Sequence, residues 1–257
     1  MTTRVFHISD VHFGVEDRDA LSKVADAVAS ERPDAVICTG DLTQRAKHSE
    51  YAAAADWFRQ LGVPVWLDPG NHDMPYYSLI ERFTDPYRRY RRLKEQVACD
   101  FASKDVVFVP LKTTVRAQRR FPWSDGVVTR KALAETLIRL SELRDDPRTI
   151  IVTAHHPLLG PQDSRSNPTI GGDRAFAAIA AAGASVVISG HVHRPFDEVR
   201  ERGEHSARTI GAGTLSTRLR HGEPASYQVL TFDGDGGVEV ELRRFGQKPQ
   251  DFSRPSA

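Results

Sequence analysis

This sequence of 257 residues has few cysteines, no long apolar runs and a net charge close to zero. Its two cysteines, Cys38 and Cys99, are too few for a disulfide framework, and Cys38, inside an apolar run, is expected to be a buried free thiol. The formal net charge of +1 argues against a globally basic nucleic-acid binder. No apolar stretch is long enough for a signal peptide or a membrane span, so we expect a cytoplasmic protein with no membrane partner.

The sequence also lacks internal repeats and a recognisable linker. Hydrophobic residues make up 40% of it and charged residues 27%, which is ordinary for a soluble globular protein. The length is sufficient for one large hydrophobic core. We predict a single domain over residues 1–246, followed by a flexible polar tail over residues 247–257.

What the sequence does contain is a set of short apolar runs that each end on side chains able to bind metals. The runs are 5–9 before Asp10 and His12, 35–40 before Asp41, 63–67 before Asn71, His72 and Asp73, 149–154 before His155 and His156, and 185–190 before His191 and His193. Continuous apolar runs are typical of buried parallel strands, and ligands gather beyond the carboxyl ends of such strands. We therefore predict that these side chains converge on one two-metal hydrolytic site.

Strand-like and helix-like segments alternate from the start of the chain, which predicts a layered α/β fold. Helices are predicted over 18–30, 49–61, 76–96, 131–143 and 175–182, with Ser49 as the candidate N-cap of the second and a break at Asp85-Pro86 in the third. Strands are also predicted over 106–109, 196–200, 207–210, 226–232 and 237–242. The last two strands are expected to form a hairpin around the glycine-rich turn between them.

The predicted ligands mix oxygen and nitrogen donors. Carboxylates, an amide and imidazoles together suit Mn, Fe, Zn or Co better than Ca or Mg, and no cysteine is placed to form a thiolate zinc site. Asp10 and His12 are two residues apart, so they point the same way if the strand continues, or both turn inward if a tight loop follows the strand. His191 and His193 repeat this spacing near the other end of the chain.

Each motif alone has an ordinary structural explanation. An Asp-x-His pair is common at turns, and Asp41 after a glycine is a frequent turn or helix cap. The Gly70–Asp73 block, the His155-His156 pair and the Gly190-His191-x-His193 block are harder to explain, because buried imidazoles need partners. The five motifs in this order leave little room for a purely structural reading.

This order of motifs resembles the calcineurin-like metallophosphoesterase superfamily, with all five blocks present between Asp10 and His193. The resemblance implies a four-layer α/β/β/α sandwich with two mixed β-sheets. It implies two divalent or trivalent metal ions. The implied ligands are Asp10, His12 and His193 for one ion and Asn71, His155 and His191 for the other, with Asp41 bridging both. The catalytic residues it implies are His72, an acid near the metals, and Asp73, its orienting partner.

A mechanism follows from general chemistry and agrees with this assignment. Two metals about 3.5–4 Å apart bind and deprotonate a bridging water and clamp the phosphoryl oxygens. The bridging hydroxide attacks phosphorus in line, while His72 gives a proton to the leaving group. Asp73 is expected to fix the tautomer of His72. These residues do not determine whether diesters or monoesters are preferred.

Several motifs indicate the branch of the superfamily. The residues after Asp41 lack the Asp-Arg-Gly of protein serine/threonine phosphatases, and His72 stands where lipid A pathway pyrophosphohydrolases usually carry Arg. The blocks at 40–43 and 155–157 are most similar to bacterial class III cyclic nucleotide phosphodiesterases. We therefore expect a phosphodiesterase acting on a small diester or nucleotide, with 3′,5′-cyclic nucleotides as candidate substrates. The alternatives are a broad-specificity phosphomonoesterase, a nuclease-like hydrolase and, from a different class, a non-catalytic metal-binding scaffold.

A few residues remain open at this point. His156 either contacts a ligand or the substrate, or merely packs against His155. Arg45 and Arg218 either meet a phosphate or are solvated. The arginine-rich segment 76–96 and the basic, aromatic stretch 116–123 fit a nucleotide or single-stranded nucleic acid, but a solvated helix face or a homodimer contact explains them more simply. The other histidines, His7, His48, His205 and His221, have no ligand-like setting.

Overall fold

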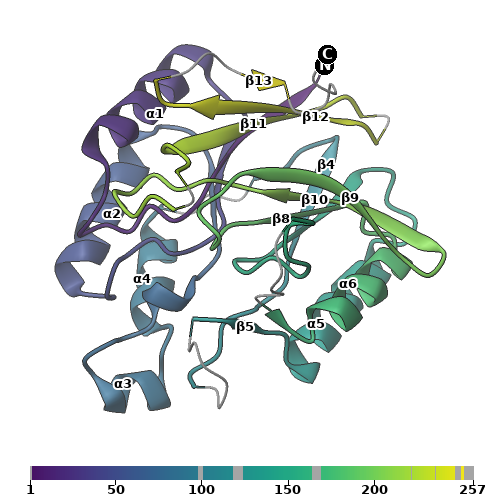
Figure 1. Ribbon diagram of the computed structural model, residues 1–257, viewed down its shortest axis with the longest axis horizontal. Helices are drawn as coiled ribbons and strands as arrows, with labels where there is room; N and C mark the ends of the chain where they lie inside the picture. Colours follow the sequence, from purple (N-terminus) through teal and green to yellow (C-terminus); the bar gives the residue numbers. More distant parts are fainter. Residues whose placement is uncertain are drawn as a thin grey trace.

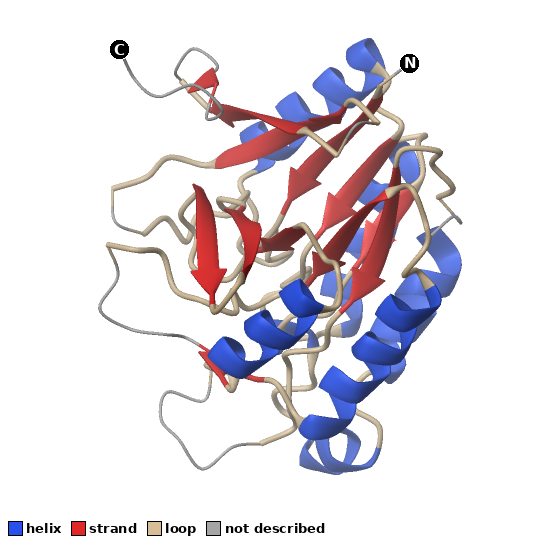
Figure 2. Ribbon diagram, turned by 90° about the vertical axis from the view of Figure 1, so that its right-hand side faces the viewer, coloured by secondary structure: helices blue, strands red, loops and turns tan. Residues whose placement is uncertain are grey.

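Two β-sheets face each other in the computed structural model, and helices cover their outer faces (Figure 1). The structure describes residues 2–97, 101–117, 124–163, 169–220, 222–234, 236–246 and 250–251. Helices α1 and α2 lie on one side of the sheets, and α5 and α6 lie on the other (Figure 1). Figure 2 shows the same arrangement after a 90° turn, with helices in blue and strands in red.

The sheets are both mixed. The larger has the strand order β13-β12-β11-β1-β2-β3, in which β1 (Thr3–Ile8), β2 (Ala35–Cys38) and β3 (Val65–Leu67) run parallel and β11 (Ser226–Phe232), β12 (Val238–Arg244) and β13 (Gln250–Asp251) are antiparallel neighbours. The second has the order β4-β6-β8-β10-β9, formed by β4 (Val106–Pro110), β6 (Thr149–Thr153), β8 (Val186–Ser189), β10 (His205–Gly211) and β9 (Phe196–Arg202), of which only β9 is antiparallel to its neighbour. Two further strands of two residues each, β5 (Gly126–Val127) and β7 (Thr169–Ile170), pair with each other.

The helices occupy the connections between strands. They are α1 (Arg18–Glu31), α2 (His48–Gln60), α3 (Leu79–Thr84), α4 (Arg88–Val97), α5 (Arg130–Glu142) and α6 (Gly172–Ala181), together with a short 3₁₀ helix, η1 (Asn71–Asp73). Each predicted helix is present within a few residues of its expected range, and the break at Asp85-Pro86 separates α3 from α4. No helix among the described residues is long and apolar enough to cross a membrane.

Alternation along the strands explains the four layers. Phe6 packs in a cluster with α1, α2 and α4, whereas its neighbour Val5 packs in the core between the two sheets. In the second sheet, Ile151 faces that same central core, and Val152 packs with α5 and α6. Strands buried on both faces are apolar at most positions on either face, which is why they read as nearly continuous hydrophobic runs. The predicted four-layer α/β/β/α sandwich is confirmed.

Two local predictions are corrected by the structure, and others concern residues that it does not describe. Helix α2 begins at His48, and its first turn is held by the Glu50 carboxylate, which accepts from Lys47 N, so Ser49 is not the N-cap. Gln250–Asp251 pair with β12 as the edge strand, so this part of the predicted tail belongs to the sheet. The rest of the tail, Cys99, residues 118–123 and His221 lie outside the described residues, whereas Cys38 is a buried free thiol as expected.

Candidate metal centre

The predicted ligands lie at the carboxyl ends of five strands drawn from both sheets. Asp10 and His12 follow β1, Asp41 follows β2, η1 with Asn71 follows β3, His155 follows β6, and His191 and His193 follow β8. All of these except the half-buried Asn71 are buried. The two sheets are joined here directly, because His191 N donates to Asp10 Oδ2 over 2.7 Å and His155 Nδ1 bonds to Thr39 O over 2.8 Å.

Most of these residues have a left-handed backbone. Seven described non-glycine residues have positive φ, and five of them are predicted ligands: Asp10, His12, Asp41, His191 and His193, at φ 53°, 50°, 51°, 70° and 58°. Such a conformation costs about 1–3 kcal/mol per residue and concentrates at functional sites. Of the two alternatives for Asp10 and His12, the tight loop is the one observed, since β1 ends at Ile8.

Two glycines allow the loops to approach this closely. A Cβ atom on Gly190 would lie 1.8 Å from Ser9 Oγ, and one on Gly70 would lie 2.1 Å from Asp41 Oδ1. Real Cβ atoms do not tolerate such contacts, so only glycine fits at either position. The glycines that precede the predicted ligands in the sequence are therefore part of how the centre is built.

The donor atoms form two groups that share Asp41. On one side, Asp10 Oδ1 lies 3.1 Å from His193 Nε2, and Asp41 Oδ2 lies 3.6 Å from His12 Nε2. On the other side, Asp41 Oδ1 lies 3.4 Å from His155 Nε2, which is 3.1 Å from Asn71 Oδ1. The His191 ring is 5.2 Å from the His155 ring.

Backbone carbonyl groups orient two of the candidate ligand imidazoles. Nδ1 of His155 bonds to Thr39 O over 2.8 Å, and Nδ1 of His193 bonds to Arg218 O over 2.7 Å. A carbonyl oxygen can only accept, so each Nδ1 carries a proton and Nε2 is the ring nitrogen that faces the centre. This is the arrangement that a metal-binding imidazole requires.

The buried carboxylates of the centre are suited to bind cations. Burial by itself raises the pKa of Asp10 and Asp41, but the neighbouring histidines outweigh it and hold the pKa of both carboxyls well below its usual range. Asp41 also raises the pKa of His155 to about 9, against the opposing effect of burial. Asp10 Oδ1 is buried without a hydrogen bond. Two ionised carboxylates, imidazole lone pairs and an orphaned oxygen fit a pair of metal ions bound through oxygen and nitrogen.

His72 points to the same centre, but Asp73 does not orient it. His72 Nδ1 bonds to the backbone oxygen of Gln44 over 2.7 Å, and the His72 ring lies 4.8 Å from that of His12. The Asp73 carboxylate instead accepts from Leu42 N, Thr43 N, Thr43 Oγ1 and Gly70 N. The predicted role of Asp73 as tautomer partner is therefore wrong. Burial and the nearby Asp41 raise the pKa of Asp73 to about 7.

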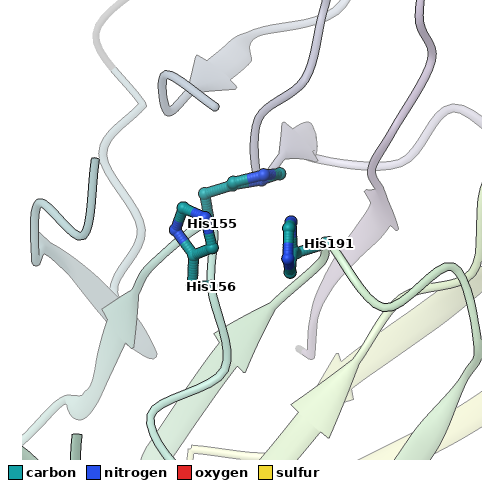
Figure 3. A group of neighbouring side chains, drawn as sticks. All are labelled: His155, His156 and His191. Carbon is teal, nitrogen blue, oxygen red and sulfur yellow. The ribbon is translucent and has the colours of Figure 1, made fainter. Parts of the chain in front are cut away.

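His156 is engaged away from the centre. Its Nδ1 bonds to Thr113 Oγ1 over 2.9 Å, and its Nε2 bonds to Ser124 O over 2.8 Å. The rings of His155, His156 and His191 lie next to one another (Figure 3). Because both nitrogens of His156 already have partners, the residue packs against two candidate ligands without offering a free donor atom. The packing alternative from the sequence is the one that the geometry favours.

The structure places the remaining basic candidates in different settings. In the segment 76–96, Arg88 and Arg89 both pair with Glu81, and Arg91 pairs with Asp85, so these arginines hold α3 and α4 together. Arg45 is exposed and bonds to Tyr77 Oη. Among the candidates that the structure describes, only Arg218 reaches the centre, and no motif marks it. The carbonyl groups of Thr39 and Gln44 could not be found from the sequence either, because every residue has one.

Comparison with known proteins agrees with the geometry. The model of the calcineurin-like phosphoesterase family matches residues 3–195, which is most of the chain and includes every candidate ligand. This chain belongs to that family. The expected metal-dependent phosphoester hydrolase is thereby confirmed at the level of the family.

Three relatives of this calcineurin-like phosphoesterase are named as phosphodiesterases. It is 27% identical over 208 residues to glycerophosphodiester phosphodiesterase GpdQ of Enterobacter lignolyticus, covering 73% of this chain and 69% of the relative. It is 24% identical over 261 residues to a probable cyclic nucleotide phosphodiesterase of Synechococcus sp., covering 94% and 92%. A second probable cyclic nucleotide phosphodiesterase, from Pseudoalteromonas sp., is 35% identical over 167 residues, covering 60% and 57%.

Solved structures share the fold at low sequence identity. A dimetal phosphatase from Danio rerio superposes with a TM-score of 0.66 at 14% identity, covering 96% of this chain and 98% of the other. The purple acid phosphatase PPD1 of yellow lupin superposes with a TM-score of 0.60 at 13% identity, covering 96% and 52%. At these identities the likeness concerns the fold alone.

Proposed function

We propose that this calcineurin-like phosphoesterase is a binuclear phosphodiesterase. Asp10, His12 and His193 would hold one metal ion, and Asn71, His155 and His191 would hold the second. The observation that carries the proposal is the position of Asp41, whose two oxygens lie 3.6 Å from His12 Nε2 and 3.4 Å from His155 Nε2. A carboxylate between two donor groups is suited to bridge two ions. When bound, the ions would withdraw charge from the phosphoryl oxygens and lower the pKa of water.

His72 is suited to deliver a proton to the leaving group. Its Nδ1–H is held by Gln44 O, so its Nε2 is the atom that gains and loses the working proton. The ring is half-buried at the edge of the centre, where it can exchange protons with solvent. As the bond from phosphorus to the leaving oxygen breaks, that oxygen takes the proton from Nε2, and the imidazole is left neutral.

The names of the relatives support diester hydrolysis over monoester hydrolysis. Their names include glycerophosphodiester phosphodiesterase and probable cyclic nucleotide phosphodiesterase, and these activities share a phosphodiester substrate. We propose 3′,5′-cyclic nucleotides as the first substrates to try, with glycerophosphodiesters as the second. For the metals, we propose Mn, Fe, Zn or Co, because the donor set combines imidazole with carboxylate.

The test is hydrolysis by the Mn-reconstituted protein of bis-p-nitrophenyl phosphate, p-nitrophenyl phosphate, 3′,5′-cyclic AMP and a glycerophosphodiester, with Asp41→Asn as the blank. Turnover of the diesters well above the monoester, lost in the variant, is the expected result. Turnover of the monoester alone would make the protein a phosphatase. Two bound metals with no turnover of any ester would instead support the non-catalytic scaffold.

A further inference from the structure

The loop after β10 brings an arginine to the candidate metal centre. Arg218 is half-buried, and its Nη1 lies 3.1 Å from His72 Nε2, 3.4 Å from His12 Nε2 and 3.3 Å from Gln44 Oε1. Arg218 and His72 are 146 positions apart in the sequence. The solvated alternative considered for Arg218 therefore does not describe its position.

The backbone of this loop is fixed by the loops of the centre itself. Thr214 Oγ1 donates to Asp10 O over 2.7 Å, and Thr217 N donates to Val15 O over 3.0 Å. The carbonyl oxygen of Arg218 accepts from His193 Nδ1 over 2.7 Å. The direction of the Arg218 side chain is thus set by the same contacts that position two candidate ligands.

The guanidinium group has an incomplete set of acceptors. Among the described residues, its hydrogen-bond partners are one amide oxygen and two imidazole nitrogens, and no carboxylate forms an ion pair with it. Arginine carries five N–H donors in a planar fork that matches carboxylate or phosphate. Removing such a cation from water without an anionic partner is unfavourable. An anion that enters the centre would complete its coordination.

We propose that Arg218 binds a non-bridging oxygen of the substrate phosphoryl group next to His72, with Gln44 positioning the guanidinium. The inference rests on the proposed function, since it names a further substrate-binding residue of the same site. His12 Nε2 and His72 Nε2 have other tasks in that function, so the N–H groups beside them are available to phosphate. A positioned cation there stabilises the charge on the phosphoryl oxygens as the leaving group departs.

The experiment compares four variants of the full chain, of which Arg218→Ala serves for chemical rescue. Arg218→Met removes the charge and keeps the length, and Arg218→Lys keeps the charge without the fork. Arg139→Met is the matched control, because it removes an exposed arginine of α5, outside the centre. For each we would measure kcat and KM on bis-p-nitrophenyl phosphate, the Kd of inorganic phosphate by calorimetry, and metal content.

We expect Arg218→Met to lower kcat/KM by about 100-fold, the scale seen for loss of one positioned donor. The affinity for inorganic phosphate should fall at least several-fold with unchanged metal content, and Arg218→Lys should lie between. Arg218→Ala should regain activity in guanidinium at millimolar concentration, which a merely structural residue would not do. Arg139→Met should resemble the native protein.

Unchanged phosphate affinity in Arg218→Met would overturn the inference, and so would a loss of metal that accounts for the whole defect. Phosphate binding is measured without turnover. A native protein that hydrolyses no ester but loses phosphate affinity in Arg218→Met would therefore refute the proposed function and leave the anion-binding role standing.

Discussion

Thr43 and Asp73 are joined twice, because the N–H and the hydroxyl of Thr43 both donate to Asp73 Oδ1 over 2.9 Å. The same carboxylate accepts from Leu42 N and Gly70 N. Asp73 therefore fastens the loop after Asp41 to η1. The buried Asp73 carboxylate is thus a structural group, and it affects the centre by holding together two loops that carry candidate ligands.

Replacing this carboxylate should reduce stability. We expect Asp73→Asn to lower the free energy of unfolding by about 2 kcal/mol, because an amide cannot accept from all four donors and buried donors without partners are costly. Urea unfolding measures the loss, and Thr43→Ser, which keeps the hydroxyl that bonds to Asp73 and Ala46 N, is the control. A stable variant whose pH–rate profile changed instead would return Asp73 to the role of orienting His72.

Removing metal should abolish hydrolysis and loosen the fold. Buried carboxylates and left-handed ligand residues are unfavourable without cations, so treatment with EDTA should lower the thermal midpoint, and Mn should restore it. At a metal concentration 100 times Kd the expected stabilisation is about 2.7 kcal/mol per ion. Asp41→Asn should bind fewer than two ions by elemental analysis. Equal thermal midpoints with and without metal would contradict this account of the centre.

The acid role of His72 predicts a dependence on the leaving group. In His72→Asn, hydrolysis of an ester with a poor leaving group such as a sugar hydroxyl should slow by about 10²–10⁴-fold, the range for general acid catalysis. Loss of p-nitrophenolate needs little protonation, so that reaction should slow much less. The measurement is kcat for both kinds of diester. An equal loss on both would show that His72 acts on binding or on the metals.

His7 should make stability depend on pH. It is buried between Gln228 Oε1 at 3.1 Å and Thr39 Oγ1 at 3.0 Å, and burial lowers its pKa to about 4. The unfolded chain, with a pKa of about 6.5, binds a proton between these values that the folded chain excludes. The contribution of His7 to the free energy of unfolding is therefore complete above pH 6.5 and is lost as pH falls toward 4.

The expected loss from His7 between pH 7.5 and pH 5 is about 2 kcal/mol. Urea unfolding at both pH values, in the native protein and in His7→Gln, separates the stability loss due to His7 from that due to the other histidines. The variant should lose correspondingly less stability on acidification. Parallel losses in the two proteins would show that His7 does not titrate in this way.

The sequence was sufficient to identify the strands that build the centre. Runs such as 149–154 are mostly apolar and carry no charged residue because the strands are buried on both faces, and this property is local. The polar residues that follow them were therefore readable as a convergent set, and parallel strand order brings their ends together. The helices over 18–30 and 131–143 were equally visible from their spacing and differ from α1 and α5 by one residue at each end or less.

The tertiary structure alone decided how the ligands are oriented and what surrounds them. His155 is oriented by Thr39 O, 116 positions away, and His193 by the carbonyl of Arg218. Such backbone groups are the same in every residue, so no sequence pattern marks them. The partners of Asp73 and His156 and the approach of Arg218 depend likewise on distances between loops that meet only after the two sheets have packed. The sequence determined which side chains gather at the centre, and the packing of the sheets determined which atoms of those side chains face one another.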